Sequence, residues 1–122
     1  MRTLDILTAW ILIALGAVHI ALTRTVNPNM GIQAIWFASG GLLIVAIGTL
    51  NLLRVAYRRV ARGVYLVSLI ANLVLVLLML SFAALVPMRS NPQILFGLIL
   101  AVLLTAFSVL RRGDNVQSRQ VH

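Results

Sequence analysis

Four long apolar stretches make up most of the chain, and short connectors containing polar residues and proline separate them. They lie at residues 6–23, 32–53, 64–86 and 94–110. At about 1.5 Å of rise per residue, each is long enough for a hydrocarbon layer about 30 Å thick. Because no stretch alternates polar and apolar positions, the pattern predicts helices and not barrel strands. We expect an all-α integral membrane protein: a four-transmembrane-helix antiparallel bundle occupying residues 1–112.

The connectors predict how these helices begin and end. Asn27-Pro28 in the first connector favours a turn, and Pro92 suits the first position of the last helix, so both connectors predict tight hairpins. The second connector predicts helix extending past the membrane surface, with Gly63 as the expected stop. Residues 113–122 contain few apolar side chains and predict a flexible cytoplasmic tail.

Composition also indicates a membrane protein. Apolar residues make up 61% of the chain and the mean hydropathy is +1.05, whereas soluble domains are roughly 45–50% apolar. The absence of cysteine excludes disulfides, thiolate metal sites and iron–sulfur clusters. The sequence also lacks paired carboxylates, a metal-ligand cluster and a phosphate-binding loop. We therefore expect no enzymatic activity, no catalytic residues, no metal and no cofactor.

The distribution of arginine predicts the orientation in the membrane. The net charge of +8 comes from ten Arg against two acidic residues, Asp5 and Asp114. Eight Arg lie at positions that share one predicted side of the membrane: before the first stretch, between the second and third, or after the fourth. The other two, Arg24 and Arg89, lie in the first and third connectors. Basic residues mark the cytoplasmic side, so both termini are predicted there, in a bacterial inner membrane. This charge fits anionic lipid headgroups, and we expect membrane lipids and no nucleic acid as partners.

Polar residues inside a membrane span are costly and are therefore the first functional candidates. His19 is the only ionisable residue well inside a predicted span. Antiparallel packing sorts the polar residues into two layers with an apolar middle, which argues against a water-filled pore through one monomer. The outer layer contains His19, Thr23, Gln33, Trp36, Ser39 and Gln93, with Arg24 and Arg89 above it. The inner layer contains Thr8, Asn51, Ser68, Asn72, Thr105 and Ser108.

Small residues and amides within the spans predict contacts between helices, because small side chains let backbones approach and amides form hydrogen bonds. The residues expected to pack helices together are Gly16, Gly40, Gly41, Asn51, Asn72 and Gly97. Histidine also forms such structural hydrogen bonds, so the sequence leaves open whether His19 binds a ligand or joins two helices.

Two known families are similar in size to this chain. Small multidrug transporters depend on a glutamate in the first span, and this sequence contains no Glu. Small fluoride channels have an asparagine-bearing second span and a phenylalanine-rich third span, but here Asn51 lies near the end of the second stretch and the third is rich in leucine. Neither activity is expected from these residues.

The function expected from the sequence is binding or transport of a lipophilic or anionic small molecule through an outer-side intramembrane pocket around His19. The residues expected to bind the ligand are His19, Arg24, Gln33, Trp36, Ser39 and Gln93. The first alternative is a structural or accessory subunit, or an oligomerising scaffold, of a larger membrane complex. The second alternative is a channel formed by a homo-oligomer.

Overall fold

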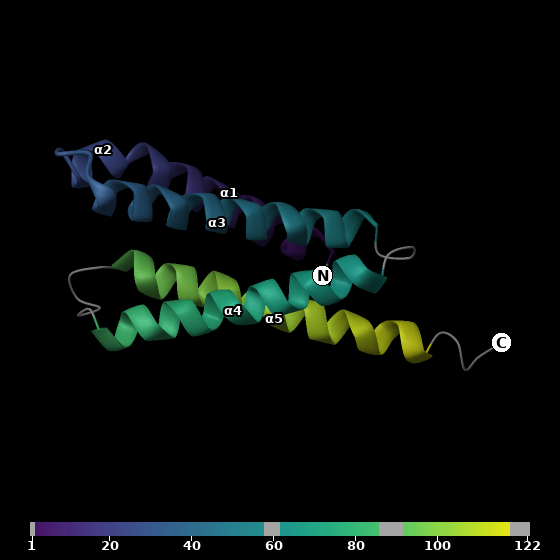
Figure 1. The fold of residues 1–122 in the computed structure, drawn as a ribbon. Helices are drawn as coiled ribbons and strands as arrows, with labels where there is room; N and C mark the ends of the chain where they lie inside the picture. Colours follow the sequence, from purple (N-terminus) through teal and green to yellow (C-terminus); the bar gives the residue numbers. More distant parts are fainter. Residues whose placement is uncertain (1, 58–61, 86–91, 118–122) are drawn as a thin grey trace.

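A computed structural model describes residues 2–57, 62–85 and 92–117, which are helical apart from short turns and contain no strand (Figure 1). The helices are α1 (Arg2–Ala21), α2 (Thr23–Val26), α3 (Ile32–Ala56), α4 (Arg62–Leu85) and α5 (Pro92–Gln117). Helices α1, α3 and α4 are each long and apolar enough to cross a membrane, and α5 contains a shorter apolar stretch, Ile94–Leu110. The prediction of an all-helical fold is confirmed for the described residues, and three of the helices are compatible with crossing a membrane.

The first predicted turn is present and follows α2. Helical hydrogen bonds continue from α1 into α2, since Val26 N donates to Leu22 O at 2.9 Å. Pro28 cannot donate a backbone hydrogen bond, and Met30 N donates to Asn27 O at 3.1 Å, which closes a four-residue turn. Met30 has φ 46, in the left-handed region, and lets the chain reverse into α3.

The other connectors differ in part from the prediction. Helix α3 ends at Ala56, and α4 already includes Gly63, so the prediction that Gly63 stops a helix is wrong. A Cβ at Gly63 would meet nothing within 4 Å, so no close packing requires glycine there. Helix α5 begins at Pro92, as expected, and runs to Gln117, so residues 113–117 of the predicted tail are helical. Residues 118–122 lie outside the described part.

The long helices form two hairpins, α1 with α3 and α4 with α5 (Figure 1). Glycines let the backbones of α1 and α3 touch: a Cβ on Gly16 would lie 2.7 Å from Gly41 O, and one on Gly48 would lie 3.0 Å from Ala9 O. In the second hairpin, a Cβ on Gly97 would lie 3.1 Å from the flexible Met79 Sδ. The tighter contact is therefore between α1 and α3.

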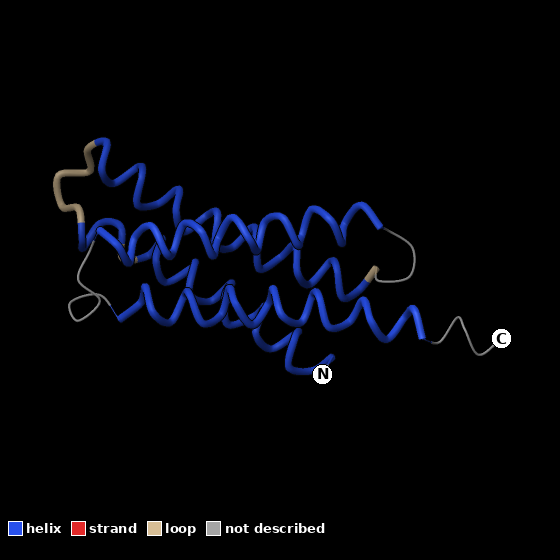
Figure 2. Tube along the Cα trace, turned by 90° about the horizontal axis from the view of Figure 1, so that it is seen from below, coloured by secondary structure: helices blue, strands red, loops and turns tan. Residues whose placement is uncertain are grey.

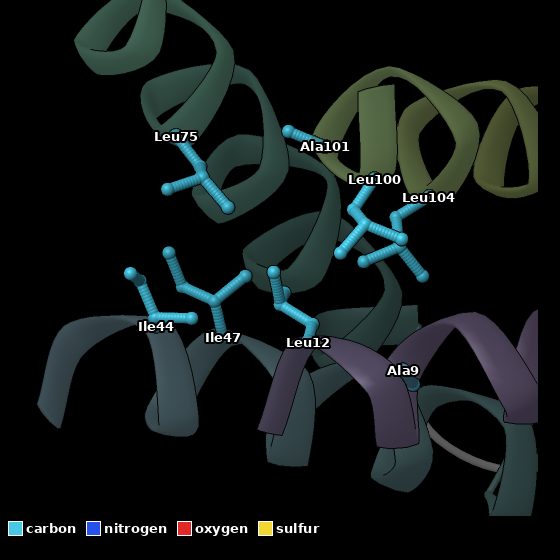
Figure 3. Packing of buried hydrophobic residues seen from close by; sticks show 8 residues of the cluster. All are labelled: Ala9, Leu12, Ile44, Ile47, Leu75, Leu100, Ala101 and Leu104. Atoms are coloured by element: carbon cyan, nitrogen blue, oxygen red, sulfur yellow. The ribbon is translucent and has the colours of Figure 1, made fainter. Parts of the chain in front are cut away.

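The two hairpins meet in an apolar core at mid-length. In Figure 3 the side chains of α1 and α3 point toward those of α4 and α5. The core contains Ala9, Leu12, Ile44, Ile47, Leu75, Leu100, Ala101 and Leu104. Figures 1 and 2 both place α2 and its turn at one end of the bundle and the far end of α5 at the other. Within each hairpin the two long helices run antiparallel (Figure 1), and polar residues lie on either side of one apolar layer.

Candidate functional site

A cavity of about 540 Å³ lies between the two hairpins, at the end of the bundle that includes α2. This volume is in the range of about 300–1,000 Å³ that is usual for small-molecule sites. The residues that line it are Leu12, Leu15, His19, Val26, Asn27, Gln33, Trp36, Phe37, Gly40, Ile44, Leu75, Leu78, Met79, Phe82, Ile94 and Gly97. Three of them, Leu12, Ile44 and Leu75, also belong to the core and form the cavity floor.

The polar side chains of the lining are His19, Asn27, Gln33 and Trp36, and all lie toward the turn. The His19 ring stacks on Phe37, with ring centroids 3.8 Å apart and planes 14° from parallel. Gly40 leaves the space beside it open, because a Cβ there would meet only His19 Nε2, at 3.7 Å. The cavity thus has hydrogen-bonding groups at one end and an apolar floor at the other, a combination that is common in small-molecule sites.

Trp36 and Phe82 connect the cavity to the outside of the bundle. Both line it, yet Trp36 is 75% exposed and Phe82 is 45% exposed. They come from α3 and α4, one helix of each hairpin. A side chain that borders the cavity and is also this exposed lies at its mouth. The cavity therefore opens to the surface of the bundle beside these two side chains.

The six residues expected to bind a ligand separate into three groups. His19, Gln33 and Trp36 come together in the cavity lining. Arg24 and Ser39 are exposed and are not part of that lining, and the Ser39 hydroxyl donates to Trp36 O at 2.8 Å. Serine often satisfies its hydroxyl in this way within its own helix. The Gln93 side chain lies outside the described part of the structure.

Asn27 is a lining residue that sequence reasoning missed. Its Nδ2 atom is buried and has no hydrogen-bond partner within the described ranges. Beside the cavity the turn encloses a second hollow of about 420 Å³, and Asn27 lines both. The sequence signal was present in Asn27-Pro28, but that pair also favours a turn, and local pattern does not reveal burial.

At the opposite end of the bundle a polar network joins all four long helices. Arg54 Nη2 donates to Asp5 Oδ1 at 2.7 Å, and both side chains are buried. Asn51 and Asn72 form a reciprocal amide pair, with Nδ2 to Oδ1 distances of 2.7 and 3.0 Å. We call this set the polar network; its members are Asp5, Asn51, Arg54, Ser68, Asn72 and Ser108.

Asn51 is the centre of the polar network. Its Oδ1 accepts hydrogen bonds from Ser68 Oγ at 3.1 Å, from Asn72 Nδ2 at 3.0 Å and from two nitrogens of Arg54 at 3.2 and 3.3 Å. Four members of the inner layer therefore meet as expected. Thr8 and Thr105 instead donate to carbonyls of their own helices. From the sequence, Arg54 is expected only to mark the cytoplasmic side of the membrane, and its burial beside Asp5 was not predicted.

No family model, curated protein or solved structure matches this chain. The described residues also contain no group of three or more His, Asp or Glu side chains that could hold a metal ion. The fold and the site together define a small helical protein with three membrane-compatible helices and a cavity between two hairpins.

Proposed function

We propose that the protein binds a lipophilic molecule in this cavity, without catalysing a reaction, as a binding or carrier protein of a bacterial inner membrane. The observation that carries the proposal is the cavity itself: about 540 Å³ with an apolar floor, hydrogen-bonding groups at one end and exposed aromatic residues at its mouth. The ligand's polar head would lie beside His19 and Gln33, and its apolar part would lie toward Leu12 and Leu75.

We further propose that all four long helices cross the membrane, with both termini in the cytoplasm and the cavity in the outer half. For α5, this proposal is supported by the packing of α5 along α4 and by the hydrogen bond from Asn72 Nδ2 to Ser108 Oγ. That bond places the part of α5 around Ser108 at the polar network. Because Arg54 is buried beside Asp5, it no longer counts as a free topological charge. The remaining seven Arg on the proposed cytoplasmic side still outnumber Arg24 and Arg89.

Binding is favoured over ion conduction by one monomer. Leu12, Leu75 and Leu104 are fully buried between the cavity and the polar network. A conducting path needs polar groups or water along its length, and this apolar layer interrupts it. A ligand that enters from the lipid needs no such path.

The proposal is tested by filling the cavity. Gly40→Phe places a ring beside His19, whereas Gly63→Phe makes the same change where no atom lies within 4 Å of the added Cβ. Native mass spectrometry from membranes should show a retained lipophilic molecule on the wild type and on Gly63→Phe, and its loss from Gly40→Phe. Equal retention by all three proteins, or a defined oligomer without any ligand, would contradict the proposal; the latter would support a structural subunit.

A further inference from the structure

The turn between α2 and α3 holds a hydrogen-bond donor in a fixed position. Asn27 N donates to Thr23 O at 2.9 Å, and Asn27 O accepts from Met30 N at 3.1 Å, so both backbone groups are occupied. Pro28 restricts the backbone on the next residue. The Nδ2 atom is nevertheless buried without a partner among the described residues. A buried donor of this kind is costly unless something accepts its hydrogen bond.

The residue that carries this donor lines the polar end of the cavity, where we place the ligand's head. Asn27 lines the cavity together with Gln33 and Trp36, and the Trp indole N–H donates but does not accept. The amide of Gln33 can do either, and the His19 ring supplies one further donor or acceptor. The polar end of the cavity therefore has more donors than acceptors, which favours a head that accepts hydrogen bonds.

The distribution of charged residues at the cavity end of the bundle favours a ligand with an anionic head. No Asp or Glu occurs between residues 6 and 113. Asp5 is paired with Arg54 at the far end of the bundle, and Asp114 belongs to the last part of α5, also far from α2. Arg24, in contrast, is on α2 and exposed near the cavity end. A cationic head would find no opposite charge here, whereas an anionic head would accept hydrogen bonds from neutral donors close to a cation.

We propose that the cavity takes an acyl-chain amphiphile with an anionic head, and that Asn27 Nδ2 donates a hydrogen bond to that head. The inference rests on the proposed binding function and specifies its ligand class. Fatty acids and anionic phospholipids share this chemistry. The acyl chain lies along the apolar floor and continues through the mouth beside Trp36 and Phe82 into the lipid, so the chain is not limited to the cavity volume.

The chain offers a direct reporter, because it has two tryptophans and only Trp36 lines the cavity. In a Trp10→Phe background, Trp36 fluorescence is followed in phosphatidylcholine nanodiscs while brominated octadecanoic acid, its methyl ester or brominated octadecylamine is added. Only the quenching that is reversed when an unbrominated analogue is added is counted as binding. We expect the acid to bind about tenfold more tightly than the ester or the amine, the size of effect typical of a charge-assisted hydrogen bond.

Asn27→Asp replaces the donor by an acceptor of the same shape and keeps a residue that favours the turn. The substitution should weaken binding of the acid about tenfold, so that the amine then binds more tightly than the acid. Misfolding would not produce this reversal. Asn29→Asp makes the same charge change at an exposed position two residues along and should change binding of the acid less than about twofold. If phosphatidylglycerol competes with the acid, a phospholipid is the source of the anionic head. If it does not compete, the source is a free fatty acid. Either result supports an acyl-chain amphiphile with an anionic head.

The outcomes separate this inference from the function on which it rests. Reversible quenching that is equal for acid, ester and amine would overturn the anionic-head inference and leave the binding function standing. Equal losses of acid binding in Asn27→Asp and Asn29→Asp would overturn the hydrogen bond from Asn27 to the head. No reversible quenching by any of the three compounds or by phosphatidylglycerol would contradict lipid binding in the cavity itself.

Discussion

At one end of the bundle, six buried polar side chains from α1, α3, α4 and α5 bind one another, whereas at the other end the same helices surround a cavity of about 540 Å³. Among the described residues, the side-chain hydrogen bonds that cross between the two hairpins all belong to the polar network. The hairpins are thus fixed to each other at one end. At the other end their separation is set by apolar contacts, which adapt more readily to a ligand.

The difference follows from how each end treats polar groups. Burying an amide or an ion pair in an apolar environment is unfavourable unless partners with good geometry are present. In the polar network Asn51 and Asn72 satisfy each other, and Arg54 offsets Asp5. At the cavity end His19 stacks on an aromatic ring, and the Asn27 amide has no protein partner in the described ranges. Polar groups that bind each other stabilise the fold, and under our proposal the polar groups of the cavity lining bind the ligand.

The strongest way to break the fixed end is to remove the charge on Arg54. Arg54→Leu removes the cation that donates to Asp5 Oδ1 in the buried pair, and the expected loss in free energy of unfolding is about 3–5 kcal/mol. Reversible unfolding in mixed detergent and SDS micelles measures it. Arg62→Leu, at an exposed position at the start of α4, is the matched control.

The double variant Asp5→Leu/Arg54→Leu sharpens this test. Because it removes both charges, it should be less destabilised than Arg54→Leu, even though it changes more residues. If Arg54→Leu and Arg62→Leu unfold with the same free energy, the ion pair does not hold this end together.

A smaller effect is expected from removing the amide that joins the hairpins. Asn72→Leu keeps a similar volume but loses two hydrogen bonds to Asn51 and one to Ser108. At the strengths measured between membrane helices, about 0.6 kcal/mol on average, the loss should be about 1–2 kcal/mol. Ser81→Ala, whose exposed hydroxyl bonds only within α4, should change the same unfolding free energy by less than about 0.5 kcal/mol. Equal effects of the two substitutions would show that the amide pair adds nothing to the connection.

Hydropathy alone predicted the helices and the two polar layers, because apolar length and antiparallel order are properties of the sequence. It did not predict the pairing of Asp5 with Arg54, which lie 49 residues apart. That pair depends on the close approach of α1 to α3 at Gly16, Gly41 and Gly48. The positive-inside rule treats every flanking arginine as a marker of membrane orientation, and it does not indicate which arginine side chain is buried in the bundle.

The candidate site was predicted in part for a similar reason. Helical spacing puts Gln33 and Trp36 on one face of the second span, antiparallel packing puts His19 of the first span at the same depth, and the structure places all three along one cavity. Ser39 was placed with them by nearness in sequence, but its side chain is exposed and bonds its own helix. The burial of Asn27 depends on a turn closed by left-handed Met30, a conformation that residue types do not specify.

Distances between spin labels on this cysteine-free chain measure whether the hairpins are fixed to each other at one end and adaptable at the other. One exposed pair, Ile32→Cys with Leu85→Cys, reports the cavity end, and another, Leu53→Cys with Leu66→Cys, reports the network end. Electron–electron double resonance should give a narrow distribution at the network end and a broader one at the cavity end. Adding Asn72→Leu should broaden the network-end distribution. Equal widths at the two ends, or a network-end distribution that Asn72→Leu leaves unchanged, would contradict the account.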